Sequence, residues 1–509
     1  MHRQAQPRAE LCLHGTQDLP RRGGGAGVPN LQPGGGGHPG EAPRRCATCQ
    51  ALLPARAYRQ GGAYQRKGRP PRGQLTTGGR GGWRCLCAAA TSPPPPICVG
   101  QPLSETFYWH DYETWGSTPA VDRPCQFAGL RTDIDLNAIG EPLVIFARPA
   151  DDLLPQPDAC LITGITPQRA AKEGLPEVAF ARAIERELGV PGTCGVGYNS
   201  LRFDDEITRH LFYRNLLPPY AHTHRNGNSR WDLIDVLRLA HALRPGGIQW
   251  PEREPGVTSF KLEDLTAANA VAHAGAHDAL ADVRATIAMA RLLKAAQPRL
   301  FDYALTLRSR KVVEDLIDRG EPLLHVSHRF SAAQGCIAPV LMVASAEDNP
   351  KQRWCFDLRA DPSVLLDLSA DAIRARVFTA SGALPEGVER IPLKGLKTNA
   401  VPMLAPIKTL DAEAAARWDI DVATVSAHAA VIRQHADAIA AKVREVHRRE
   451  PDTGPRDPER MLYGGGFFAD ADVREMARLH DLSPQALAGE HPRFQDPRLA
   501  TLLFRMRAR

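Results

Sequence analysis

Residues 106–116 read TFYWHDYETWG, an apolar and aromatic run that ends at a glycine. This composition predicts a β-strand followed by a turn. Asp111 and Glu113 are two residues apart, so a strand would place both carboxylates on the same face of a sheet. Hard oxygen ligands suit Mg²⁺ or Mn²⁺, whereas a zinc site would use histidine or cysteine. A solvated strand edge is the ordinary alternative.

A second acidic group follows TCGVGYNS (193–200), a glycine-rich apolar segment that predicts another strand. The residues after it, FDDEITRHLFYRN, predict a helix with Asp204 and Asp205 in its first turn. Acidic side chains there also complement the helix dipole, so the pair has a structural alternative.

The third group is AHDALAD (276–282), which opens a long amphipathic helix. His277 and Asp282 are five residues apart, or about 140° around a helix of 3.6 residues per turn. Both can therefore serve one site only if His277 lies at or before the first turn. A buried histidine is the alternative.

The order of these groups resembles the DEDD superfamily of 3′→5′ exonucleases, in the branch whose last motif is H-x-x-x-x-D. Longer stretches resemble the bacterial exodeoxyribonuclease I family from about Thr106 onward, namely HDYETWG, DRPCQFAGLRTD, LITGITPQ, GYNSLRFDDE, NSRWDLIDV, AHDALADV and QPRLFDY. The resemblance implies an enzyme that degrades single-stranded DNA from a free 3′ end to 5′-mononucleotides, in DNA repair, recombination and mismatch repair.

The same resemblance implies a catalytic set of Asp111, Glu113, Asp204, His277 and Asp282. The four carboxylates would hold two Mg²⁺ ions, for which Mn²⁺ can substitute, with Asp111 as the bridging ligand. Glu113 and Asp282 would lie on the metal that holds the attacking water, and Asp204 on the second metal. His277 would take the proton from that water, because imidazole titrates near neutral pH.

Positions that contact the strand in this family correspond to Glu113, Arg209, Tyr220, His224, Arg238 and Lys261. His222 and His224 stand where the family can show tryptophan, and Lys261 where it can show arginine. Histidine offers less stacking area and lysine has no guanidinium fork, so we expect weaker or more pH-sensitive strand binding. Each arginine could instead be a solvated surface group.

The coarse pattern predicts an α/β exonuclease domain over residues 104–297, with a mixed sheet flanked by helices, as in the ribonuclease H-like fold that the resemblance implies. Its predicted elements are strands over 106–115, 125–133, 142–148 and 193–198, and a helix near 176–188. Short strands after residue 300 predict a small β-barrel, and the family has a Src-homology-3-like domain there, expected over 298–448. A C-terminal helical domain is expected over 449–509.

Residues 1–103 differ in composition from the rest of the chain. The first 100 residues hold 19 of the 43 glycines and 13 of the 43 prolines, which predicts a disordered or non-native extension. A natural start near Val99 is one interpretation, and a basic arm that binds nucleic acid is the other. The motif CATC followed by CLC also leaves a zinc site open as a minor alternative.

The end of the chain carries a further expectation, because LATLLFRMRAR stops where the family continues for several helices. We expect a truncated C-terminal domain, with reduced stability of the family's clamp around DNA and reduced processivity. Part of the surface that docks single-stranded DNA-binding protein would also be missing.

The charge and the cysteine content indicate where the positive charge lies and in which compartment the protein is expected. The net charge is +6, but the first 100 residues carry 14 Lys and Arg against 3 Asp and Glu, so the enzyme-like part is mildly acidic. Scattered cysteines and the lack of an apolar run near 18 residues predict a cytoplasmic protein without a membrane span. We expect a monomer.

The alternatives to a DNA exonuclease are an exoribonuclease of the same superfamily and a non-catalytic strand-binding remnant.

Overall fold

The computed structural model describes residues 105–273, 275, 277–448, 454 and 456–509. The predictions for residues 1–103, including the start near Val99, the basic arm and the cysteine site, lie outside the described residues. Within those residues, no helix combines the length and the apolar content that a membrane span requires.

A mixed sheet forms the centre of the first domain, as predicted, and it has five strands. Its order is β3-β2-β1-β4-β5, with β1 to β3 antiparallel and with β4 and β5 parallel to β1. The strands are β1 (Thr106–Thr114), β2 (Pro124–Thr132), β3 (Ala138–Phe146), β4 (Thr193–Gly197) and β5 (Ser229–Asp232). The sequence pattern did not predict β5.

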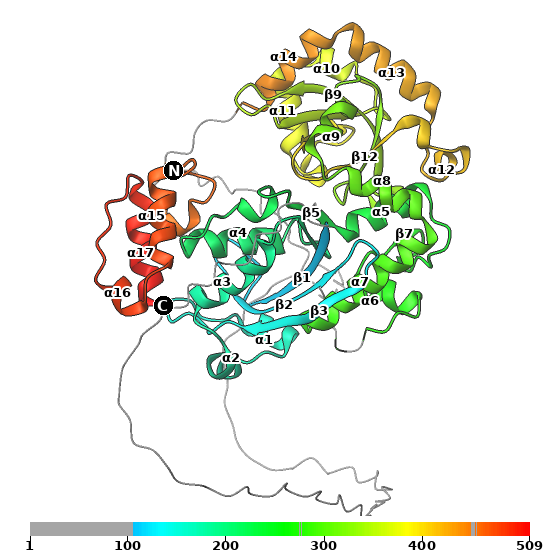
Figure 1. Cartoon of the computed structure of the whole chain (residues 1–509). Helices are drawn as coiled ribbons and strands as arrows, with labels where there is room; N and C mark the ends of the chain where they lie inside the picture. Colours follow the sequence, from blue (N-terminus) through cyan, green and yellow to red (C-terminus); the bar gives the residue numbers. More distant parts are fainter. Residues whose placement is uncertain (1–104, 274, 276, 449–453, 455) are drawn as a thin grey trace, which may run out of the picture. The chain divides into compact units, whose positions relative to one another are not determined.

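The alternation of side chains along β1 decides which helices cover each face of the sheet. Tyr108 and Tyr112 pack in a core with α3 (Glu177–Leu188) and α4 (Asp204–Arg214). Phe107 and Trp109 point the other way, into the core that includes α5 (Leu233–Leu243) and α7 (Ala279–Ala296). Figure 1 shows α3 and α4 on one side of the sheet and α7 on the other. Because side chains alternate, Asp111 and Glu113 share the face covered by α7.

Shorter elements complete this domain. Helices α1 (Pro157–Thr163) and α2 (Pro167–Glu173) follow β3, and neither was predicted from the sequence. The 3₁₀ turn η1 (Ala221–Thr223) follows α4. The hairpin strands β6 (Glu252–Glu254) and β7 (Val257–Thr258) precede α6 (Leu262–Ala268).

A second sheet follows α8 (Pro298–Thr306) and α9 (Arg310–Ile317). Its five strands are antiparallel, in the order β11-β10-β9-β8-β12. They are β8 (Leu323–Val326), β9 (Ile337–Ser345), β10 (Gln352–Asp357), β11 (Leu393–Lys397) and β12 (Met403–Pro406), with η2 (Ala332–Gln334) before β9. The predicted short strands of the Src-homology-3-like domain are present, and they form a sheet that is not closed, with β11 and β12 at its edges.

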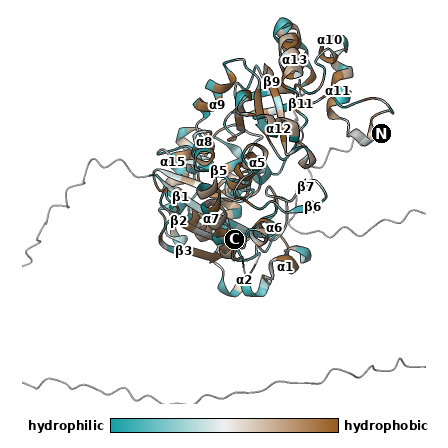
Figure 2. Ribbon diagram, turned by 90° about the vertical axis from the view of Figure 1, so that its right-hand side faces the viewer, coloured by the Kyte–Doolittle hydropathy of each residue, from teal (hydrophilic) through white to brown (hydrophobic). Residues whose placement is uncertain are grey.

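Helices surround this second sheet. They are α10 (Val364–Asp367), α11 (Ala370–Phe378), α12 (Ala412–Arg417), α13 (Val422–Gln434) and α14 (Ala436–Val446), with the 3₁₀ turns η3 (Ser381–Ala383) and η4 (Ile407–Thr409). Helix α14 packs on β9. Helices α13 and α14 follow one another directly and are separated by a backbone break at His435, which has φ −118° and ψ 25°. Figure 2 shows brown and teal residues together on α13, as expected of a helix with one buried face.

The last part of the described chain is helical. It comprises η5 (Pro458–Arg460), α15 (Asp470–His480), α16 (Pro484–Ala488) and α17 (Pro497–Ala508). The apolar stripe of α17, with Leu499, Leu502 and Met506, packs in one core with Tyr213 and Leu216 at the end of α4. This stripe is therefore buried against the first domain.

Candidate active site

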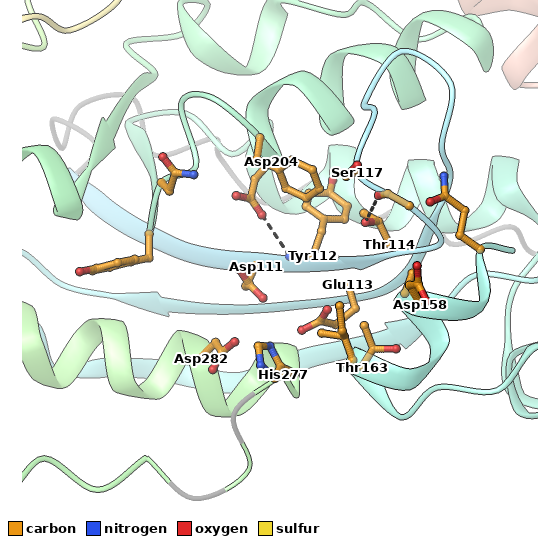
Figure 3. Close-up of a pocket in the computed structure, with 17 residues that line it drawn as sticks. Asp111, Tyr112, Glu113, Thr114, Ser117, Asp158, Thr163, Asp204, His277 and Asp282 are labelled. Atoms are coloured by element: carbon orange, nitrogen blue, oxygen red, sulfur yellow. Dashed lines mark hydrogen bonds between the residues drawn. The ribbon is translucent and has the colours of Figure 1, made fainter. Parts of the chain in front are cut away.

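The site lies where β1 extends beyond its parallel neighbour. β1 pairs with β4 from Thr106 to Trp109, where the parallel ladder ends. Further along, the backbone N–H of Tyr112 donates to Oδ1 of Asp204 at 3.1 Å. The Tyr112 hydroxyl also lies 2.9 Å from Oγ1 of Thr208. The first turns of α4 are thus tied to β1, which brings Asp204 to the strand that carries Asp111 (Figure 3).

The start of α7 is fixed from β2. Asp278 caps the helix by accepting a hydrogen bond from the N–H of Ala281 at 3.2 Å. The Gln126 amide donates to Oδ2 of Asp278 at 3.1 Å, and its oxygen accepts from the N–H of Ala279 at 3.3 Å. His277 precedes the helix with φ 69°, so the prediction that it lies before the first turn is confirmed.

One pocket contains all five predicted catalytic side chains. Its cavity of about 170 Å³ is lined by Asp111, Glu113, Asp204, His277 and Asp282. Ligand atoms of Glu113, His277 and Asp282 lie within 4.8 Å of one another. Figure 3 shows Asp111 and Glu113 on the side of β1 that faces Asp282 and His277. Apolar side chains of α1 and of the segment before α4 complete the wall, namely Ala159, Ile162 and Phe203.

The carboxylates in this pocket repel one another. Burial, followed by the charges of Asp204, Asp282 and Glu113, raises the pKa of Asp111 well above its ordinary value. Burial and the Asp282 carboxylate likewise raise the pKa of Glu113, and burial raises the pKa of Asp204 to about 8. Such shifts favour the neutral acids unless a cation is present. The donor set of carboxylate oxygens and one imidazole therefore fits divalent metal ions.

His273 is a site residue that the sequence analysis missed. Its Nε2 lies 2.5 Å from Oδ1 of Asp282, and its Nδ1 lies 3.2 Å from Oγ1 of Thr266. The side chain is only 5% exposed. The available signal was a second histidine four residues before His277, in HAGAH.

The two arginines predicted to contact DNA are engaged within the protein. Arg209 donates to Oε1 of Glu206 at 2.6 Å and to the Tyr463 hydroxyl at 3.2 Å. Arg238 donates to Oδ1 of Asp235 at 2.8 Å. The two side chains are 10% and 11% exposed, which leaves little of either guanidinium for a phosphate in this conformation.

The other predicted DNA contacts differ in exposure. Tyr220 is half-buried. His224 is exposed, and its Nδ1 lies 2.8 Å from the carbonyl oxygen of Tyr220. His222, by contrast, is buried against Phe212, with ring centroids 5.3 Å apart. Lys261 is exposed and precedes α6. Of the two histidines at tryptophan positions, only His224 is on the surface.

Comparisons with known proteins agree with these features. Residues 108–290 match the family described as Exonuclease, residues 308–449 the Exonuclease I SH3-like domain, and residues 456–509 the Exonuclease I C-terminal domain. Exodeoxyribonuclease I of Escherichia coli (strain K12) is 46% identical over 406 residues, which cover 79% of this chain and 85% of the relative.

Two solved structures extend the likeness to the fold. The exonuclease I from Methylocaldum szegediense has 48% identity and a TM-score of 0.75, and the match covers 80% of this chain and 85% of that one. A zinc-bound complex of E. coli exonuclease I with single-stranded DNA has 45% identity and a TM-score of 0.76, with coverage of 80% and 86%. This chain belongs to the exodeoxyribonuclease I family, with a ribonuclease H-like exonuclease domain, an SH3-like domain and a C-terminal domain.

Proposed function

We propose that this protein is a 3′→5′ exonuclease that hydrolyses single-stranded DNA to 5′-mononucleotides. The observation that carries the proposal is the convergence of four carboxylates and His277 in one pocket. The E. coli family member was crystallised with single-stranded DNA, which supports the choice of substrate. Roles in DNA repair, recombination and mismatch repair belong to the same proposal.

The pocket would hold two divalent ions, and we propose Mg²⁺, with Mn²⁺ as a substitute. Their ligands would be Asp111, Glu113, Asp204 and Asp282, whose mutual repulsion a bound cation relieves. Bound ions supply the positive charge that phosphodiester hydrolysis needs at the attacking and leaving oxygens. Hard carboxylate oxygens are the reason to prefer Mg²⁺ over zinc.

His277 would act as the general base. It lines the pocket beside Glu113 and Asp282, and imidazole can accept the proton of an attacking water near neutral pH. Glu113 would also contact the terminal nucleotide. The tie between Tyr112 N–H and Asp204, and the Gln126 contacts to the start of α7, hold the two helices that deliver these groups.

We also propose contacts between the DNA strand and Arg209, Tyr220, His224, Arg238 and Lys261. Because Arg209 and Arg238 are held in ion pairs, they would contact a phosphate only by exchanging part of those bonds. A monomer, a cytoplasmic location and binding to single-stranded DNA-binding protein complete the proposal. The five described cysteines, all free thiols, suit a reducing compartment.

Two alternative functions are an exoribonuclease and a non-catalytic strand-binding remnant. An exoribonuclease would use the same pocket on RNA, but the match to the Exonuclease I SH3-like domain favours DNA. A non-catalytic remnant would not need all five pocket residues, and all five are present.

One assay separates these functions. The purified protein is mixed with 3′-labelled single-stranded DNA, duplex DNA or RNA, with Mg²⁺ or with EDTA. We expect Mg²⁺-dependent release of mononucleotides from single-stranded DNA. Asp111→Ala or Asp282→Ala should abolish hydrolysis and leave strand binding measurable, and His277→Ala should slow it about 10²- to 10⁴-fold. Wild-type rates in these variants, or a preference for RNA, would refute the proposal.

A further inference from the structure

The loop between β1 and β2, residues 115–123, forms one edge of the pocket. Gly116 and Ser117 of this loop line the cavity (Figure 3). The N–H of Trp115 donates to the carbonyl oxygen of Arg123 at 2.8 Å, which closes the loop at its base. Glu113 lies only two residues before Trp115 on the same strand. A displacement of Arg123 would therefore be passed on to a proposed metal ligand.

The β1–β2 loop is packed closely against the segment that precedes α1. The N–H of Gln156 donates to the carbonyl oxygen of Trp115 at 2.9 Å, and its side-chain amide donates to Oδ1 of Asp122 at 3.1 Å. A Cβ on Gly116 would lie 2.3 Å from Nε2 of Gln156 and 2.4 Å from Cγ of Asp122. A loop packed this closely cannot absorb a shift at its base without a shift at the pocket.

The Arg123 side chain enters a buried cluster of ion pairs with the C-terminal part, residues 456–509. Its Nη2 donates to Oε2 of Glu459, in η5, at 2.9 Å, and its Nη1 lies 3.8 Å from Oε1 of Glu177 in α3. The Arg123 and Glu459 side chains are 8% and 11% exposed. Arg214 also donates to Glu177, and Arg509 donates to Oε1 of Glu459 at 2.6 Å. Loss of the Glu459 charge would leave three guanidinium groups with one buried carboxylate, which is unfavourable.

The same cluster reaches the pocket edge by a second route. Nη2 of Arg509 donates to Oδ2 of Asp152 at 2.5 Å, four residues before Gln156. Asp152 is half exposed, so this pair contributes less than the buried one. The Glu459 carboxylate thus links Arg123, at the base of the loop, with the residue that holds the segment packed against the loop.

We propose that Glu459 and Arg123 are positioning residues, whose buried ion pair lets the C-terminal part fix the edge of the pocket and the orientation of Glu113. This inference rests on the proposed function. It gives the C-terminal part a role in the geometry of hydrolysis, in addition to the clamp expected around DNA. Such a role has a large effect because a misplacement of about 1 Å at a reacting centre can lower the rate about 100-fold.

The first test compares Glu459→Gln and Arg123→Gln with the wild type as full chains. Initial rates at saturating oligothymidylate, well below the Tm of every variant, should fall about 10- to 100-fold, and half-maximal rate should need more Mg²⁺. The Kd of labelled oligothymidylate, measured by fluorescence anisotropy in EDTA, should stay the same because both side chains are buried. Unchanged rates would overturn the proposal. Unchanged rates at saturation with a raised Kd would assign the pair to strand binding instead.

Two further variants test whether the pair acts as a unit. Glu459→Asp keeps the carboxylate and should recover part of the rate that Glu459→Gln loses. The double variant Arg123→Gln/Glu459→Gln should be no slower than the slower single variant, because both changes break the same contact. Fully additive losses would show that the two residues act separately and would overturn the proposed pair.

Asp472→Asn is the matched control for lost stability of the C-terminal part. Asp472 is 2% exposed and accepts hydrogen bonds from the backbone N–H groups of Gln495 at 2.8 Å and Asp496 at 3.0 Å. Its replacement should lower the Tm and leave the rate unchanged, since these contacts lie within residues 456–509. An equal loss of rate in Asp472→Asn and Glu459→Gln would assign the effect to domain stability and overturn the positioning role.

Hydrogen exchange supplies a readout that does not depend on activity. The N–H of Trp115 is bonded to the Arg123 carbonyl oxygen, and those of Val121 and Asp122 to the Thr118 carbonyl oxygen. These three amides should exchange faster in Glu459→Gln than in the wild type and should be unaffected in Asp472→Asn. A lost rate with unchanged exchange in the loop would mean that Glu459 does not act through the loop.

The outcome is distinguishable from failure of the proposed function. A wild-type protein that does not hydrolyse single-stranded DNA would contradict that function. A protein that hydrolyses it equally fast with Glu459→Gln would contradict the positioning role alone.

Discussion

Nε2 of His273 lies 2.5 Å from Oδ1 of Asp282, and Nδ1 lies 3.2 Å from the Thr266 hydroxyl oxygen. That hydroxyl in turn donates to the Glu263 carbonyl oxygen at 3.0 Å. The imidazole thus links Asp282 to the backbone at the start of α6. A carboxylate held in this way keeps its orientation when a cation binds.

We expect His273→Ala to raise the Mg²⁺ concentration for half-maximal hydrolysis about 10- to 100-fold, because Asp282 loses its support. His273→Gln can still donate a hydrogen bond from its amide and should recover part of the affinity. Rates measured across a Mg²⁺ titration check this. Unchanged Mg²⁺ dependence in both variants would show that His273 does not orient Asp282.

Metal binding should stabilise the fold, because Asp111 is buried among like charges. With Mg²⁺ at about 100 times its Kd, linkage predicts a gain of about 2.7 kcal/mol and a rise of several degrees in Tm. Asp111→Asn should melt higher than the wild type in EDTA, since one repelling charge is gone, and should lose most of the Mg²⁺ increment. Scanning fluorimetry in EDTA and in Mg²⁺ measures both. An equal increment in the two proteins would contradict the assignment of Asp111 as a ligand.

His→Trp changes at the two tryptophan positions should have different effects: tighter DNA binding at His224 and lower stability at His222. His224 is exposed, so His224→Trp adds stacking area and should strengthen binding of oligothymidylate about fivefold. His222 is packed against Phe212, so His222→Trp should lower stability by about 1 to 3 kcal/mol through overpacking. Anisotropy and thermal melting of the two variants test the contrast. If both variants bound oligothymidylate more tightly without losing stability, or if both lost stability, the described difference in burial between His222 and His224 would be contradicted.

Lys394 should give stability a specific dependence on pH. Its Nζ lies 2.8 Å from Nε2 of His325, whose Nδ1 is 3.2 Å from the Met403 carbonyl oxygen. The neutral histidine therefore donates through Nδ1 and accepts from the lysine through Nε2. Burial lowers the pKa of Lys394 to about 8 from 10.5.

Because the unfolded chain holds this proton up to higher pH, it binds more protons than the folded chain between about pH 8 and 10.5. Stability contributed by Lys394 therefore rises with pH across that window. Relative to Lys394→Met, the wild type should gain about 1 to 3 kcal/mol between pH 7.5 and 10. Urea denaturation measures this, with Lys397→Met as the control, since Lys397 is exposed on the same strand. A pH-independent difference would show that Lys394 keeps its charge when folded.

The parts of the fold with strong local patterns were predictable from the sequence. The alternation in β1 placed Asp111 and Glu113 on one face, and the spacing of His277 and Asp282 required His277 to precede α7, as the structure has it. The strand order of the second sheet, with β11 and β12 at its edges, was not predictable, because it is set by long-range pairing that short β segments do not encode.

The site was predictable in its carboxylates and less so in its surroundings. The ion pairs of Arg209 with Glu206 and of Arg238 with Asp235 have spacings of three residues, a helical signal that was visible in the sequence. Tyr463 lies 254 residues after Arg209, and no local pattern could bring the two together.

The Tyr112 amide shows that sheet formation and nuclease chemistry compete for one donor. In a longer parallel ladder this N–H would point at a strand carbonyl, yet here it holds the Asp204 carboxylate. An insertion that prolonged β4 by two residues would complete the ladder and displace Asp204. Homologous chains should therefore tolerate length changes in the loop after β4 far better than in β4 itself.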